Sequence, residues 1–273
     1  MTTNQVVKRN RLAFVLLREA AMPAPEAVLS AFARIAPPRK VPALRLTPTQ
    51  SDAGAEALFF ELGHEGRLVV GLLPAPIPRQ EAEQHADRSL ASVKVGWKPE
   101  AHRAHLAVMW QELATLPAVE SLKRYTWLLA AVADASKSIA VYWAESGATH
   151  HGEYFVEVAK DGVDSPLLVT LWSGLSVGAD SRNRQRTTFV SLGMSQLDLP
   201  DLELSVPLGY DRDEAVGFFY ELLAYTIERG AAIPEGNTVG RSPDERLKVR
   251  YVPSPIDAAK KVWRVDLPGD SDL

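Results

Sequence analysis

The 273-residue chain contains no cysteine, which removes several kinds of site at once. Without a thiol there can be no disulfide, no thiolate zinc site and no cysteine nucleophile. Basic residues are not in excess either, since 30 Lys and Arg stand against 34 Asp and Glu, a formal net charge of -4. Neutralising nucleic-acid phosphates requires a basic excess, so we do not expect nucleic acid as a partner.

Long hydrophobic runs are also lacking, and a membrane span needs roughly 20 apolar residues. The apolar run 12–17 follows Lys8 and Arg9, an order that resembles a signal peptide. That run is too short for the hydrophobic region of a signal peptide, and Arg18 and Glu19 close it. We therefore predict a cytoplasmic protein with no membrane partner.

Sequence signatures of common catalytic and cofactor sites are missing. There is no Gly-x-Ser-x-Gly nucleophile elbow, no P-loop and no Gly-x-Gly-x-x-Gly. The glycines at 174, 178 and 193 are scattered through a predicted hairpin. From the residues we expect no cofactor, no metal and no enzymatic activity of a recognisable type.

The composition that is present, 46% hydrophobic and 23% charged residues, is typical of a globular protein. Apolar periodicity distinguishes helices from strands along the chain. The predicted helices are 25–35, 117–135, 152–160 capped by Thr149, and 212–229 capped by Asp211 and ended by Gly230. The predicted strands are 12–17, 41–47, 57–62, 67–73, 105–110, 139–143, 167–176, 187–194, 247–252 and 262–267.

This order of elements predicts an α+β fold with mixed or mainly antiparallel sheets and helices packed on one face. Ferredoxin-like halves are one candidate arrangement. No long polar linker divides the chain, so we expect an N-terminal half, 12–135, and a C-terminal half, 136–267, packed on each other. Residues 1–11 and 268–273 are predicted to be disordered segments.

Two histidines and one acid are candidates for a pocket. His150 and His151 are adjacent and diverge on any regular element, and Glu203 is a carboxylate that could join them in a cleft between the halves. The alternative is a capping or buried hydrogen-bonding role. His102 and His105 fall in or beside a predicted strand, where they would point to opposite faces and make a poor metal site.

The loop 178–186 carries the arginines 182, 184 and 186. Guanidinium groups bind carboxylate and phosphate in a bidentate manner, so Arg182, Arg184 and Arg186 are the candidate partner-binding residues. A solvated hairpin loop is the alternative. The acids at 198, 201 and 203 suit either a hard cation or a turn of ordinary composition. For Trp97 and Trp263, core packing and an exposed binding role both stay open.

Several short segments are similar to the DUF4261 domain family, a bacterial family of uncharacterised proteins. The matching features are Ala140 to Trp143, His150 and His151, Phe155, Pro166 before Leu171 and Trp172, Thr187 and Thr188 leading to Leu192 and Gly193, and Leu199 to Leu204. The resemblance covers residues 12–233 and is strongest in the second half. Its motifs are packing and turn residues, so it indicates kinship more than chemistry.

The resemblance implies a genetic setting near secreted toxins and type VI secretion systems. It therefore implies a non-catalytic immunity or accessory protein that binds another protein, such as a cognate toxin. Two alternatives remain: a scaffold that self-associates as a homo-oligomer, and an enzyme of unrecognised type that uses the His150, His151 and Glu203 pocket.

Overall fold

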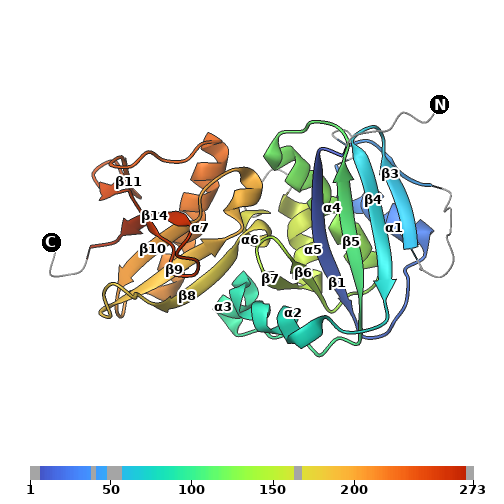
Figure 1. Cartoon of the computed structure of the whole chain (residues 1–273), viewed down its shortest axis with the longest axis horizontal. Coiled ribbons are helices and arrows are strands. Elements are labelled where there is room, and N and C mark those ends of the chain that lie inside the picture. Colours follow the sequence, from blue (N-terminus) through green and yellow to red (C-terminus); the bar gives the residue numbers. More distant parts are fainter. Residues whose placement is uncertain (1–6, 38–40, 48–56, 163–167, 269–273) are drawn as a thin grey trace. The chain divides into compact units, whose positions relative to one another are not determined.

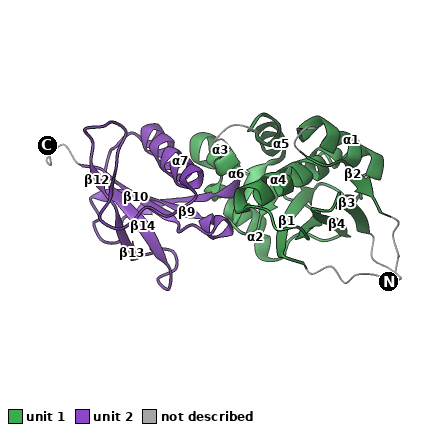
Figure 2. Cartoon of the chain, turned by 90° about the horizontal axis from the view of Figure 1, so that it is seen from above, with its two compact units in different colours: residues 1–171 green, residues 172–273 purple. Residues whose placement is uncertain are grey.

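The computed structural model describes residues 7–37, 41–47, 57–162 and 168–268. The chain divides into two compact units, Met1–Leu171 and Trp172–Leu273 (Figure 2). Each unit has a sheet of its own (Figure 1). The fold is therefore α+β with mainly antiparallel sheets, as the sequence predicts.

The first unit contains a seven-stranded sheet in the order β2-β3-β4-β5-β1-β6-β7, with every neighbouring pair antiparallel. Its strands are β1 (Arg9–Leu17), β2 (Leu44–Leu46), β3 (Ala57–Leu62), β4 (Gly66–Leu73), β5 (Ala104–Glu112), β6 (Ala140–Trp143) and β7 (Ala148–His151). Its helices are α1 (Pro25–Ile35), α2 (Glu81–Gln84), α3 (Leu90–Val95), α4 (Ala118–Ala135) and α5 (Gly152–Asp161), and 3-10 turns span Pro78–Gln80 and His85–Arg88.

Helix α4 is the centre of the helical layer on this sheet. It contacts β1 and β5 and has α1 and α5 beside it (Figure 1). Its Leu122, Tyr125 and Leu129 are fully buried, and the Tyr125 hydroxyl donates to the carbonyl of Val108 on β5 at 2.8 Å. The apolar stripe seen in the sequence thus becomes the helix face that covers the sheet.

The second unit contains a five-stranded sheet in the order β13-β14-β10-β9-β8. Its strands are β8 (Gly174–Ala179), β9 (Arg186–Leu192), β10 (Leu202–Pro207), β13 (Arg250–Pro253) and β14 (Lys261–Asp266), and β11 (Thr238–Val239) pairs with β12 (Leu247–Lys248). Strands β10 and β14 are parallel, and the other pairs are antiparallel. Helix α7 (Arg212–Arg229) packs on β10, and the short helix α6 (Val169–Trp172) carries the boundary between the units.

The structure divides the chain at another place than the sequence predicts, which is between residues 135 and 136. Strand β6 pairs with β1, and β7 pairs with β6, so both belong to the first sheet. The boundary is therefore after Leu171. In the described ranges, the elements of neither unit follow the β-α-β-β-α-β order of a ferredoxin-like half.

The ends of the chain differ in part from the sequence prediction. Residues 9–11, part of the N-terminal segment that the sequence predicts to be disordered, begin β1 and pair with 110–112 of β5. Residues 1–6 and 269–273, which belong to the two predicted disordered segments, lie outside the described residues.

Two local predictions in the middle of the chain are wrong. The range 167–176 is not one strand, because residues 169–172 form α6 before β8 begins, and Leu167 lies outside the described residues. Thr149 does not cap α5, because it lies in β7 and donates to the carbonyl of Ala82 at 2.6 Å. His151 is the N-cap residue instead.

The two tryptophans for which the sequence leaves core packing and a binding role open differ in burial. Trp263 is fully buried on β14, whereas Trp97 is only half-buried.

Within the described ranges, no helix has the length and apolar character needed to traverse a bilayer.

Candidate functional site

The arginine-rich loop is the tip of the hairpin formed by β8 and β9, and it is folded by its own side chains. The Asp180 carboxylate accepts from the backbone N–H of Arg182 at 2.8 Å, and Asn183 Oδ1 accepts from the N–H of Gln185 at 3.0 Å. Such bonds from Asp and Asn side chains to the backbone two residues ahead define tight turns. At the far end of the loop, the N–H of Leu208 donates to the carbonyl of Gln185 at 2.8 Å.

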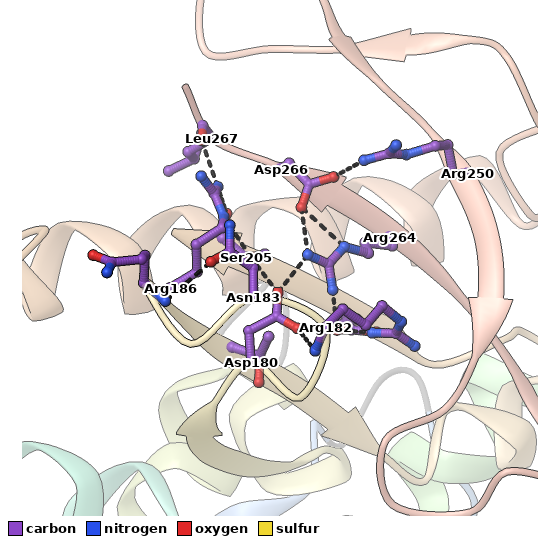
Figure 3. A network of polar contacts seen from close by, with 12 residues as sticks. Asp180, Arg182, Asn183, Arg186, Ser205, Arg250, Arg264, Asp266 and Leu267 are labelled. Atoms are coloured by element: carbon purple, nitrogen blue, oxygen red, sulfur yellow. Dashed lines mark hydrogen bonds and ion pairs between the residues drawn. The ribbon is translucent and has the colours of Figure 1, made fainter. Parts of the chain in front are cut away.

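Beneath the loop lies an ion network that joins strands β10 and β14 to the loop that follows β8 (Figure 3). Arg264 on β14 donates to Asp180 and to Glu203 on β10, each at 2.5 Å. Arg182 reaches down from the loop to both oxygens of Glu203, at 2.7 and 3.0 Å, and to the carbonyl of Pro253. Asp180 and Glu203 have no exposed surface and Arg264 is buried, whereas the Arg182 side chain is 35% exposed, so the network is desolvated beneath the loop and reaches solvent at Arg182.

The charges in this network shift one another's protonation. Burial alone would raise the pKa of Asp180, but the Arg264 guanidinium, the Arg182 N–H and the Ser205 hydroxyl lower it to about 2. Burial also raises the pKa of Glu203, against the opposing charges of Arg264 and Arg182. Because breaking a buried pair leaves an uncompensated charge, these contacts hold the loop firmly to the sheet.

The three loop arginines predicted as partner-binding residues have different roles. Arg182 is engaged in the network, and Arg186 donates to the hydroxyl and carbonyl of Ser205 at 2.9 Å and to the carbonyl of Leu267 at 2.6 Å. Arg184 is exposed at the tip and has no side-chain partner among the residues that the structure describes. Of the three, Arg184 is therefore the guanidinium that is available to a partner.

The predicted His150, His151 and Glu203 pocket is distributed over the two units. His150 and His151 lie in β7 of the first unit, whereas Glu203 lies in the second, where Arg182 and Arg264 occupy its oxygens. His150 is fully buried, and burial lowers its pKa to about 4 against an opposing contribution from the Leu171 backbone. His151 Nδ1 accepts from the N–H of Tyr154 at 3.5 Å, which is a capping role.

His102 and His105 do not point to opposite faces of one strand, because His102 precedes β5. Their ring centroids are 6.3 Å apart. His102 Nε2 accepts from the N–H of Ile77 at 2.7 Å, and Nδ1 lies 2.6 Å from Glu83 Oε1. His102 is therefore a neutral ring that donates from Nδ1, and it fastens the segment after β4 to the start of β5.

A tyrosine at the same end of the sheet joins two acid–base groups that the sequence analysis did not connect. The Tyr142 hydroxyl donates to Glu81 at 2.7 Å and lies 3.1 Å from His85 Nδ1. Burial and Glu81 raise the pKa of Tyr142, so its hydroxyl stays protonated. Burial, together with the charge of Arg88, lowers the pKa of His85. Tyr142 lies in β6, and its two partners lie in the segment 81–85. These contacts therefore hold the segment 81–85 against β6.

The acidic residues before and within β10 are structural. Asp201 Oδ1 accepts from the Ser191 hydroxyl at 2.9 Å and the Met194 N–H at 3.1 Å, which ties β9 to the start of β10. Asp198 lies in a left-handed turn with φ of 59°. In the described part of the chain, no group of three or more His, Asp or Glu side chains is placed to hold a metal ion.

Sequence reasoning missed Asp180 and Arg264, the two buried residues that organise the loop. Their spacing of 84 residues leaves no local signal. One weak signal exists, since Arg264 interrupts an apolar strand, and a charge on a buried strand needs a partner.

Part of the chain matches a known protein family. Residues 190–266 match the model of a domain of unknown function, DUF4261, which confirms the family resemblance for this part of the chain. The match lies inside the second unit and contains Glu203 and Arg264 but not the loop 180–185. No curated protein and no solved structure matches the chain.

Proposed function

We propose that the chain is a non-catalytic protein-binding protein whose hairpin tip, residues 180–185, contacts an acidic patch on its partner. The observation that carries this proposal is the exposed Arg184 on a loop that Arg182, Arg264 and Asp180 hold in place. Exposed loops on a rigid scaffold are the usual site of recognition in proteins.

The rigidity of the loop matters for affinity. A mobile loop loses conformational entropy when a partner orders it, at roughly 0.5–1.5 kcal/mol for each immobilised side chain. Here the backbone bonds at Asp180, Asn183 and Gln185 order the loop before binding. The Arg184 side chain therefore extends from an ordered backbone when its guanidinium meets a carboxylate.

The class of partner comes from the family resemblance, which implies a setting near secreted bacterial toxins. We propose that the partner is such a toxin and that the chain is its immunity or accessory protein. The alternative occupant of the loop is a second copy of this chain, as a self-associating scaffold would require.

The test is a binding measurement with the toxin-like protein encoded nearest to this chain. We expect Arg184→Glu to weaken binding by about tenfold or more, which corresponds to 1.4 kcal/mol or more. The matched control is Arg212→Glu, the same change of charge at another exposed position of the second unit. Equal losses in the two variants would show a long-range charge effect and would contradict a contact at the hairpin tip.

Light scattering on the purified chain separates the two occupants. A stable homo-oligomer that Arg184→Glu dissociates would make a second copy the partner, and the proposed toxin binding would then be wrong. A monomer that binds the toxin through Arg184 supports the proposal.

A further inference from the structure

A hollow of about 530 Å³ lies in the first unit, outside the site described above. It is bordered by the ends of β1 and α4 and by the beginnings of β6 and α5, and its apolar lining is Ala133, Ile139, Gly152 and Val156. Its volume is within the range of about 300–1,000 Å³ that small-molecule sites have.

One wall of the hollow is aromatic. Trp97 and His151 meet edge to face, with ring centroids 5.3 Å apart and an interplanar angle of 82°. His151 Nδ1 already accepts from the Tyr154 N–H, so a neutral ring carries its hydrogen on Nε2. The wall thus offers the surface of Trp97 and one unused donor on His151.

The remaining lining is charged, and part of it is already neutralised. Arg18 and Glu100 form a bidentate pair with two contacts of 3.1 Å. Asp134 is bound by Arg34, which is outside the lining, at 2.6 Å. These lining charges have partners within the protein.

Four other lining residues keep their charges available. Among the residues that the structure describes, the side chains of Lys98, Lys137, Glu153 and Glu157 form no hydrogen bond or ion pair. Two cations and two carboxylates that have no partner in the described part of the chain therefore border the same hollow.

We propose that this hollow binds a small zwitterion of the amino-acid or short-peptide class. Its ammonium group pairs with Glu153 and Glu157, its carboxylate pairs with Lys98, Lys137 and the His151 Nε2–H, and its apolar or aromatic body packs on Trp97. A ligand of one charge sign would bring its charge beside two like charges of the lining. An uncharged apolar ligand would cover charged groups without pairing them, which costs free energy.

The test follows the indole N–H signals of the six tryptophans by ¹H–¹⁵N NMR, with Trp97 assigned from Trp97→Phe. The probes are phenylalanine, arginine and the dipeptide Gly-Phe, with phenethylamine and 3-phenylpropionate as analogues that carry one charge each. We expect a saturable shift of the Trp97 signal with at least one zwitterion. If phenylalanine binds, we expect its affinity to be about tenfold or more higher than that of either analogue.

Charge-reversal variants of lining residues test whether the ligand that shifts the Trp97 signal binds in the hollow. Lys137→Glu and Glu157→Lys should each weaken binding by about tenfold, because each places a like charge against the ligand. The matched control is Lys160→Glu, an exposed position of α5 outside the lining, which should leave binding unchanged. Unchanged signals from the other five indoles show that a variant is folded.

The proposal is overturned if no zwitterion gives a saturable Trp97 shift at concentrations up to about 10 mM. It is also overturned if an analogue of one charge binds as tightly as phenylalanine, or if Lys160→Glu weakens binding as much as Lys137→Glu does. None of these outcomes depends on the hairpin tip of the second unit.

Discussion

At the scale of single residues, His150 is the clearest titrating group with a consequence for stability. Its ring is fully buried on β7, and neither ring nitrogen has a hydrogen bond of ordinary geometry within the described residues. Burial lowers the pKa from 6.5 to about 4, so the folded state resists protonation of this ring. The unfolded chain takes up a proton near pH 6.5, which means that stability falls as the pH drops from 6.5 to 4.

We predict that His150→Leu flattens this acid dependence. The wild-type chain should lose about 3 kcal/mol more unfolding free energy than the variant between pH 7 and pH 4, because a full pKa unit is worth about 1.4 kcal/mol. Urea unfolding at a series of pH values measures the difference, and His64→Leu in an exposed turn is the control. Parallel pH profiles for wild type and His150→Leu would contradict the pKa shift.

The residues of the candidate site were predictable to different degrees. The exposed loop and its arginines follow from turn-forming composition, and Arg184 has the solvent-facing position that the loop prediction requires. The inward roles of Arg182 and Arg186 could not be predicted, because their partners lie 19 to 81 residues away in the sequence, in or directly after other strands. Such pairs depend on strand order, which local patterns do not contain.

At the scale of elements, the helices were predicted best. The ranges 25–35 and 212–229 agree with α1 and α7 because a Pro or an Asp cap begins each helix and a proline pair or a glycine follows its end. Strand β10 was missed, since Asp198, Pro200 and Asp201 suggest a turn just before it. Its Glu203 and Ser205 face the buried ion network, so polar residues here lie on a buried strand.

The junction of β7 and α5 depends on a glycine. A Cβ at Gly152 would lie 2.5 Å from the carbonyl oxygen of Ser138, which is closer than side chains approach a backbone. We predict that Gly152→Ala destabilises the fold by about 1–3 kcal/mol, as overpacking does. Gly217→Ala is the matched control, since its Cβ would meet open space on α7 and should stabilise the helix by about 0.5–1 kcal/mol. Thermal unfolding compares the two variants, and shifts of the same sign would contradict the predicted clash.

At the scale of the whole molecule, the family match and the structural unit do not coincide. The matched residues, 190–266, begin inside β9 and omit β8. They also omit Asp180, which binds Arg264 beneath the hairpin tip. The boundary could not be predicted from composition, because the division falls inside the four-residue helix α6 and not in a linker.

The different bounds of the family match and of the second unit predict how fragments of the chain behave. The fragment 168–273 contains all five strands of its sheet, helix α7 and every partner of Arg264 and Glu203 described above, so we expect it to fold and to unfold cooperatively in urea. The fragment 190–266 lacks β8 and most of β9, which exposes β10 and leaves Arg264 without Asp180. Removing one partner of a buried ion pair costs about 3–5 kcal/mol, a large part of the stability of a small domain. We therefore expect 190–266 to lack a cooperative transition, and a fragment 190–266 as stable as 168–273 would show that the hairpin and its ion network are dispensable for the fold.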